Sequence, residues 1–407
     1  MTPRWPPKAR QRTGESGERE LLLHLRIVLA NLSQRNSNMK IAQIAPLMES
    51  VPPGLYGGTE RVVSHLCEAL VRKGHEVTLF ASGDSITSAN LIPCTREAIR
   101  LNPAVKDYVP HYMIMLDKVR RTARRFDVLH FHIDAFHMPL FNDIGTKTLT
   151  TLHGRQDSPD LLPLYRSFPN MPLVSISNAQ RAPIPDANFA RTIYHGLPVD
   201  LFTPSYDARG GYLAFLGRIS PEKRPDRAIA IATALGLPLK IAAKVDKQDE
   251  AYFREVVVPL LDRPGVEFVG EINDLEKSKF LGEAIALLFP IDWPEPFGLV
   301  MIEAMACGTP ILAFRHGSVP EMIDDGVTGR IAESVDEGIR LLPEVIRLDR
   351  HAVRRRFEER FSSSRMANDY VEVYRKLGRN ACVRAPSTAV AVTAIQGRLN
   401  DLDRHAT

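Results

Sequence analysis

Short apolar segments alternate with longer amphipathic segments along most of the chain. Residues 40–45 (KIAQIA) form an apolar run with the length of a buried strand. A glycine-rich loop follows, and residues 59–73 then repeat apolar positions at helical spacing, with Thr59 as the expected cap and Gly74 as the stop. Buried strands that alternate with helices predict βαβ units, parallel sheets and an α/β fold.

The same alternation continues to about residue 377. Further strands are expected at 76–81, 127–132, 146–152, 173–177, 192–194, 212–216, 239–243, 266–269, 286–290 and 310–314. Further helices are expected at 224–235, 250–261, 274–283, 298–306, 337–346, 351–359 and 364–377.

The alternation stops once, at residues 196–211, which hold two prolines and three glycines without periodicity. Such a stretch predicts a hinge between two domains, 39–195 and 212–363, and 407 residues are long enough for two cores. The two ends of the chain lack the pattern. Residues 1–38 are expected to be a disordered extension with one short helix near 21–32, and residues 378–407 a flexible tail.

The composition excludes several classes of protein. The net charge of +4 comes largely from the first residues and from 350–360, so it does not indicate nucleic-acid binding, although weak contact with anionic lipid is compatible with it. The four cysteines show no CxxC spacing, which indicates free thiols in a reducing compartment. No apolar run reaches the roughly 20 residues of a membrane helix. A cytoplasmic protein is expected, with possible peripheral contact at the inner face of the membrane.

The most informative segment is 292–308 (DWPEPFGLVMIEAMACG), where a strand delivers a loop to the carboxyl edge of a parallel sheet. A helix expected to begin at Phe297 would point unpaired amides and a positive dipole at a ligand, and Gly298 allows a phosphate to approach closely. Two glutamates eight residues apart are usually unrelated surface acids. Glu303, however, lies in a strongly apolar helix where an unpaired charge is costly, so a polar role for Glu303 and Glu295 is expected.

This segment resembles the E-x7-E signature of retaining family 4 glycosyltransferases. These enzymes have the GT-B fold, in which two Rossmann-like, doubly wound domains face each other across a cleft. The resemblance implies that Glu295 contacts hydroxyls of the donor sugar and that Glu303 contacts the ribose. It also implies that the backbone of Phe297, Gly298 and Leu299 faces the diphosphate. Residues 317–326 and Gly329 resemble the part of the family that follows this signature, and the resemblance extends over 39–377.

A second cluster follows the first strand expected in the second domain, in Gly217-Arg218-Ile-Ser-Pro-Glu-Lys223. Arg218 offers a planar fork and Lys223 a point charge, and both suit a diphosphate, although charge-rich loops are often only solvated. The cluster resembles the family's G-R-x4-K pattern. The resemblance implies that Arg218 and Lys223 neutralise the departing nucleoside diphosphate, so that neither a metal nor another cofactor is needed.

Two stretches of the sequence resemble metal-binding motifs. The only D-x-D, at Asp401 and Asp403, falls in the terminal tail and is attributed to chance. His130 and His132 alternate along a strand and are expected to point to opposite faces, which would make them poor joint ligands. No metal site is therefore predicted.

The first domain supplies a second set of candidates. Gly57 and Gly58 precede the first helix, where backbone amides can meet a phosphate or an acceptor; a glycine turn with no ligand is the alternative. The segment lacks the G-x-G-x-x-G fingerprint of dinucleotide binding. Thr151-Leu-His153-Gly154 lies at a strand end and resembles the family's T-x-H-G, whose histidine approaches the donor sugar.

The resemblance implies a transferase that moves a hexose from a UDP- or GDP-linked sugar, most commonly UDP-glucose, to an acceptor hydroxyl. Residues 39–195, completed by helix 364–377, would form the acceptor-side domain, and 212–363 would bind the nucleotide sugar. His153, Arg218, Lys223 and Glu295 are the expected catalytic residues. The acceptor is left open among small molecules, lipids and glycans.

Three alternatives remain at this point. A Rossmann dehydrogenase would need the glycine fingerprint that this sequence lacks. A glycogen-synthase-like enzyme would need a lysine before the glycine pair, where Tyr56 stands. A non-catalytic protein that binds nucleotide sugars would keep the same motifs.

Overall fold

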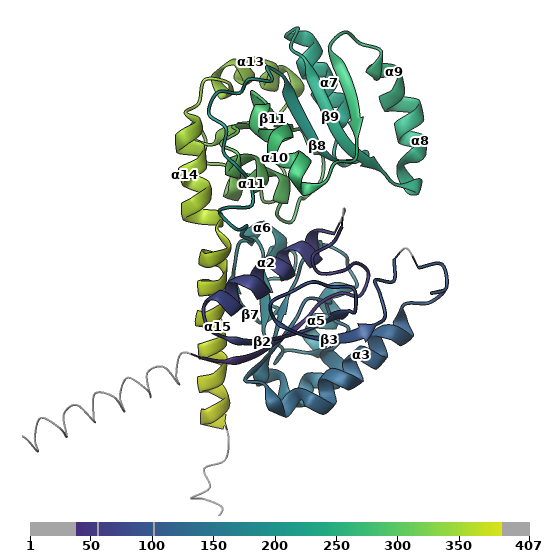
Figure 1. The fold of residues 1–407 in the computed structure, drawn as a ribbon, viewed down its shortest axis with the longest axis vertical. Coiled ribbons are helices and arrows are strands. Elements are labelled where there is room, and N and C mark those ends of the chain that lie inside the picture. The colour runs from purple at the N-terminus through teal and green to yellow at the C-terminus, as the bar shows by residue number, and fades with distance from the viewer. Residues whose placement is uncertain (1–37, 55–56, 101, 385–407) are drawn as a thin grey trace, which may run out of the picture.

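The computed structural model describes residues 38–54, 57–100 and 102–384 of the chain, with side chains as far as residue 378. These residues form two α/β domains, each with a parallel sheet, which lie one above the other in Figure 1. The α/β fold class with two parallel sheets is therefore confirmed. The expected helix near 21–32 lies outside the described residues.

The N-terminal domain contains a seven-stranded sheet in the order β3-β2-β1-β4-β5-β6-β7, with every neighbouring pair parallel. Its strands are β1 (Lys40–Ile44), β2 (Glu76–Ser82), β3 (Asn90–Thr95), β4 (Val128–Phe131), β5 (Thr148–Thr151), β6 (Leu173–Ser175) and β7 (Phe189–Thr192). The strand order reverses between β1 and β4, and ligands of doubly wound sheets bind at the carboxyl end of such a reversal.

The C-terminal domain repeats this plan with six parallel strands in the order β10-β9-β8-β11-β12-β13. Its strands are β8 (Leu213–Ile219), β9 (Leu239–Val245), β10 (Val266–Gly270), β11 (Ala286–Phe289), β12 (Ile311–Phe314) and β13 (Gly329–Ala332). The reversal here lies between β8 and β11, the strands that precede the two motif loops.

Helices cover both faces of each sheet because each strand is apolar on both faces. On the N-terminal sheet, α2 (Gly58–Arg72) and α15 (Ser363–Arg384) share one core, and α3 (Val109–Thr122) packs on the other face. Shorter helices of this domain are α4 (Met138–Phe141), α5 (Leu161–Ser167) and α6 (Asn178–Arg181).

On the C-terminal sheet, α10 (Asp274–Glu283), α11 (Leu299–Ala306) and α14 (Arg350–Phe361) pack on one face. The other face is covered by α7 (Pro225–Ala234), α13 (Val335–Val345) and the segment of α8 (Glu250–Tyr252), a π-helical turn (Phe253–Val257) and α9 (Val258–Leu261). The short helix α12 (Val319–Met322) follows β12.

The chain passes between the domains twice, and the two passages lie side by side. The amide of Leu197 donates to the carbonyl of Phe361 at 2.9 Å, and the amide of Ser363 donates to the carbonyl of Leu197 at 2.8 Å. A Cβ on Gly196 would lie 2.4 Å from the carbonyl oxygen of Ser362, so only glycine fits this approach. Beyond this point α15 runs along the N-terminal domain (Figure 1).

Several sequence expectations need correction. The strand β3 and the helix α3 were not expected; Pro93 interrupts the apolar pattern of β3, which is an edge strand. Residues 378–384, expected in a flexible tail, continue helix α15. No helix within the described ranges is long and apolar enough to cross a membrane.

Candidate active site

A cavity of about 610 Å³ lies between the two domains. It lies where the carboxyl edges of both sheets face each other, and it continues into a smaller cavity of about 160 Å³ on the side of the C-terminal domain. Every predicted site residue lines one of the two. The larger cavity is lined by Gly57, Gly58, His153, Arg218, Lys223, Glu295, Phe297, Gly298 and Leu299, and the smaller by Glu303.

The loop before α11 holds Glu295 rigidly. Gly298 has φ +80°, and the helix begins at Leu299, which is later than either start expected from the sequence, Phe297 or Gly298. The backbone of Glu295 is clamped by the turn at Gly317, where a Cβ would lie 2.3 Å from the Glu295 carbonyl oxygen. Ser318 donates its amide to that carbonyl at 2.9 Å. The Glu295 side chain is therefore fixed at the N-terminal end of α11.

The carboxylate of Glu295 meets a cation inside the cavity. It pairs with the ammonium group of Lys223 and accepts a hydrogen bond from the Trp293 indole at 3.0 Å. The Lys223 ammonium also lies 4.6 Å from the centre of the Trp293 ring. The two sequence motifs, 72 residues apart, are therefore joined by a largely buried ion pair.

Arg218 lies in the same cavity but has different partners. Its guanidinium lies 3.1 Å from Glu222, 3.5 Å from Asp249 and 3.8 Å from Asp246. The charge of Arg218 is thus already balanced by carboxylates, which the sequence did not indicate.

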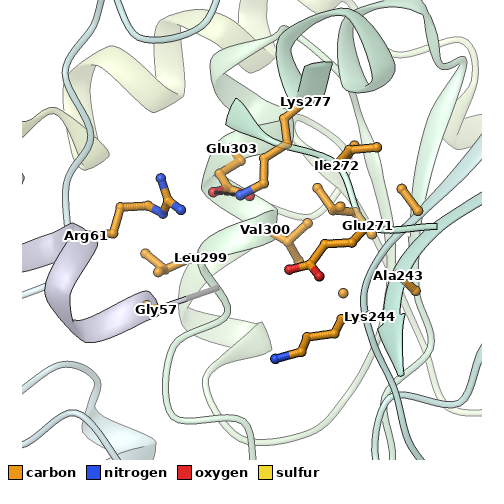
Figure 2. A pocket seen from close by; sticks show the side chains of 14 residues that line it. Gly57, Arg61, Ala243, Lys244, Glu271, Ile272, Lys277, Leu299, Val300 and Glu303 are labelled. Atoms are coloured by element: carbon orange, nitrogen blue, oxygen red, sulfur yellow. Dashed lines mark hydrogen bonds and ion pairs between the residues drawn. The ribbon is translucent and has the colours of Figure 1, made fainter. Parts of the chain in front are cut away.

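Glu303 has the polar partner that its apolar surroundings require. Its side chain is almost fully buried and lies 3.2 Å from the ammonium of Lys277 on α10. Lys277 also lies 3.3 Å from Asp274, which pairs with Arg61 of α2 in the other domain. Figure 2 shows Glu303 and Lys277 side by side, with Arg61 approaching from the N-terminal domain.

The first helix brings a second set of amides to the cleft. Gly57 caps α2 and the helix starts at Gly58, without a side-chain cap, so the prediction that Thr59 caps it is wrong. A Cβ on Gly58 would lie 3.5 Å from Leu299, the first residue of α11. The N-termini of α2 and α11 therefore lie next to each other on the wall of both cavities, and both dipoles favour an anion there.

His153 lies on the N-terminal wall of the cavity, next to other histidines. Its Nε2 lies 2.9 Å from Nδ1 of His132, and its ring stacks on His195 at 5.3 Å. Burial lowers the pKa of His153 to about 3 and holds the pKa values of His132 and His195 well below the ordinary value of a histidine. These rings are neutral near pH 7.

The expected orientation of His130 and His132 is wrong. Their ring centres lie 4.1 Å apart, because residues two apart on a strand share a face of the sheet. Both rings bond to neighbouring side chains of the domain. Within the described residues, no group of three or more His, Cys, Asp or Glu side chains could hold a metal ion.

Several residues of the cleft were missed by sequence reasoning. Lys277, Lys244 and Glu271 line the smaller cavity (Figure 2), and Arg155 lines the larger one. Arg155 lies over the Trp293 ring at 5.6 Å and so links the two domains. A signal existed only for Lys277, since a glutamate in an apolar helix needs a buried cation nearby.

The sequence and the fold can be compared with known proteins. Residues 206–359 match the model of glycosyl transferases group 1, and residues 56–184 match that of glycosyltransferase family 4. The chain is 31% identical over 338 residues to a D-inositol 3-phosphate glycosyltransferase of Mycolicibacterium smegmatis, covering 69% of this chain and 76% of the relative. It is 25% identical over 366 residues to an N-acetyl-alpha-D-glucosaminyl L-malate synthase of Bacillus anthracis, covering 78% of this chain and 93% of the relative.

Solved structures show the same arrangement of domains. The Anabaena protein HepE in complex with UDP and glucose is similar with a TM-score of 0.62 at 18% identity, over 82% of this chain and 98% of that one. Two parallel sheets facing one cleft, two family models and a relative with 31% identity agree. This chain therefore belongs to the group 1, family 4 glycosyltransferases and has their GT-B fold.

Proposed function

We propose that this glycosyltransferase moves a hexose from a nucleoside-diphosphate sugar to an acceptor hydroxyl, with retention at the anomeric carbon and without a metal. The observation that carries the proposal is the meeting of Glu295 and Lys223 at the N-terminus of α11, inside the cavity between the sheets. Helix amides and a cation bind a diphosphate, and a carboxylate accepts hydrogen bonds from sugar hydroxyls.

The positions of the residues suggest how the donor lies. The diphosphate lies beside the N-termini of α2 and α11, within reach of Arg218 and Lys223. The sugar lies between Glu295 and His153, which come from opposite walls of the larger cavity. The nucleoside extends into the smaller cavity, where Glu303 accepts from the ribose hydroxyls.

The proposed reaction breaks the bond between the anomeric carbon and the diphosphate oxygen and forms a bond to the acceptor oxygen on the same face. The acceptor proton passes to an oxygen of the leaving diphosphate. Glu295 and Glu303 do not act as the acid and nucleophile of a glycosidase, since Glu303 is assigned to the ribose. The protein lowers the barrier by stabilising negative charge on the leaving group in a closed cleft.

The cations that neutralise the leaving group are proposed to exchange partners. Lys223 and Arg218 each contact carboxylates, and the more highly charged diphosphate is a stronger partner for both. Glu295 is then released from Lys223 and becomes available to the sugar. Arginine and lysine here supply the positive charge that a divalent cation supplies elsewhere.

A uridine-linked hexose, UDP-glucose first, is proposed because a neighbour of the same fold binds UDP and glucose. GDP-mannose and UDP-N-acetylglucosamine are the next candidates. The acceptor is proposed to be a small hydroxyl compound, since one relative is named for inositol 3-phosphate and another for malate.

Ligand-induced stabilisation and product stereochemistry test this proposal. The purified chain is heated with each of the three nucleotide sugars, and the true donor raises Tm because it binds only the folded form. Transfer to candidate acceptors is then followed by NMR in the presence and absence of EDTA. Retained anomeric configuration and unchanged turnover in EDTA are expected. Inversion would refute the retaining mechanism, and loss of turnover in EDTA that added Mg²⁺ restores would refute metal independence.

A further inference from the structure

A continuous chain of hydrogen bonds runs from the C-terminal helix α15 through the N-terminal sheet to the cleft. Consecutive groups lie between 2.7 and 3.1 Å apart. In order, the side chains are Tyr370, Thr151, His130, Tyr374, Gln43, His132 and His153. All except His153 are at most 3% exposed, so each buried polar group depends on its neighbours in the chain for partners.

The geometry of the sheet explains why these groups meet. Gln43 on β1 lies directly opposite His130 on β4, and His132 lies two residues further along on the same face. The helix α15 covers this face with Tyr370 and Tyr374, which are four residues apart and therefore one turn apart. A strand-to-helix interface that would ordinarily be apolar is thus crossed by a line of polar groups.

The direction of the hydrogen bonds next to the cleft follows from Gln43. Its amide nitrogen donates to the Tyr374 oxygen at 3.1 Å, which leaves its carbonyl oxygen facing Nε2 of His132 at 2.8 Å. A carbonyl only accepts, so His132 carries its proton on Nε2. Because His132 is neutral, its Nδ1 has no proton, and His153 must donate from Nε2 across the 2.9 Å contact.

The other half of the chain has the same direction. Tyr374 accepts from Gln43, so its own proton goes to Nδ1 of His130 at 2.7 Å. His130 then donates from Nε2 to Thr151 at 2.8 Å, and Thr151 donates to Tyr370 at 2.8 Å. Burial keeps the pKa of His130 well below its ordinary value, so this ring carries a single proton.

We propose that this chain of hydrogen bonds holds His153 with its proton on Nε2, so that Nδ1 faces the cleft as an acceptor for a hydroxyl of the donor sugar. Gln43, His132 and Tyr374 are then positioning residues that act through His153. The assignment to the donor sugar rests on the proposed function, whereas the protonated nitrogen does not. The C-terminal helix thereby determines which kind of group the N-terminal wall offers to the ligand.

The test is an NMR measurement on the full chain labelled with ¹⁵N-histidine. Long-range proton–nitrogen correlations distinguish the two neutral forms of a histidine ring, and the spectrum of His153→Asn identifies the His153 signals. The wild type is expected to show His153 protonated on Nε2 only. In Tyr374→Phe the Gln43 amide loses its acceptor, and His153 is expected to become a mixture of both forms, with kcat/KM for the donor about fivefold lower.

Tyr112→Phe is the matched control. It removes another buried hydroxyl from the same domain, one that accepts from the Leu47 amide at 3.1 Å and does not belong to the chain. It is expected to keep the His153 signals and kcat/KM of the wild type. Protonation of wild-type His153 on Nδ1, an unaltered His153 in Tyr374→Phe, or unchanged kinetics in spite of an altered ring would each overturn the proposal. Normal transfer by His153→Asn would instead contradict the proposed function, leaving the assignment of the proton intact.

Discussion

The two walls of the cleft differ in the charge of the side chains that they place near the ligand. The C-terminal wall, which we call the charged wall, holds two ion pairs, Lys223 with Glu295 and Lys277 with Glu303. The part of the N-terminal wall around His153, which we call the neutral wall, holds buried histidine rings without charge, because burial lowers the pKa of His153 to about 3. The charged side chains Glu60 and Arg155 of the same domain line other parts of the cavity. Ion pairs suit a diphosphate, which takes the place of one partner, and neutral rings suit uncharged hydroxyls. Each wall thus matches the part of the donor assigned to it.

The largest expected effect is the loss of the central charge pair. Lys223→Ala and Glu295→Ala are each expected to lower kcat/KM by at least about a hundredfold, because each removes a group that the proposed mechanism places at the leaving group or the sugar. Lys240→Ala is the control; it breaks a pair with Glu267 at 3.1 Å outside the cleft and is expected to leave kcat/KM unchanged. Near-normal turnover in both cleft variants, with Tm preserved, would show that Lys223 and Glu295 do not take part in the reaction.

Acid is expected to destabilise the N-terminal domain, which contains the neutral wall, before the C-terminal domain. Burial lowers the pKa of His65 to about 4 and those of His137 and His153 to about 3, whereas the unfolded chain titrates near 6.5. The unfolded state therefore binds more protons between these values. The contribution of these histidines to the free energy of unfolding is fully present above about pH 6.5. It falls as the pH drops toward 3, by up to about 1.4 kcal/mol per histidine per pH unit.

Hydrogen exchange at pH 7 and pH 5 checks this difference between the walls. Protection factors, which correct for the slower intrinsic exchange at pH 5, are expected to fall first in the N-terminal sheet, which holds the buried histidines, and later in the C-terminal sheet. His137→Asn is expected to flatten the dependence of unfolding free energy on pH, and His351→Asn, at an exposed position of the other domain, is expected to leave it unchanged. An equal loss of amide protection in both sheets would contradict the expected difference between the two domains.

A smaller effect is expected at the smaller cavity. Lys277→Ala leaves the buried carboxylate of Glu303 without its cation, and the KM for the donor is expected to rise about tenfold with little change in kcat. Lys279→Ala removes an exposed lysine from the same helix and serves as the matched control. A fall in kcat with unchanged KM would mean that Lys277 acts on the reaction and not on binding of the nucleoside.

The charged wall was largely predictable because its residues lie in two short, continuous motifs. Strand, loop and helix follow one another in 292–308, so the order of elements placed the loop with Glu295 at the carboxyl edge of the sheet. The apolar helix around Glu303 and the family resemblance indicated a role for both glutamates. Lys277 was missed because it comes from α10, and its approach to Glu303 depends on how α10 and α11 pack. Contacts between elements distant in sequence leave little trace in a local pattern.

The neutral wall was predicted poorly for two reasons. His153 was identified by its motif, but the faces of His130 and His132 were assigned wrongly by miscounting the two-residue period of a strand. Their partner Tyr374 comes from the far end of the chain, so only tertiary structure reveals it. The strand β3, with Pro93 inside it, shows that an edge strand tolerates a residue that weakens the sequence signal.

The paired passages at Leu197 and Ser363 have a consequence for protein engineering. A chimaera of two relatives cannot be made with a single cut near residue 197, because α15 follows the second passage yet belongs to the core of the first domain. The C-terminal domain can be exchanged only as an insert between the two passages. The helix α15 must then come from the parent that supplies the N-terminal domain. Under the proposed function, such an insert would transfer specificity for the nucleotide, while His153 would keep the helix that supports it.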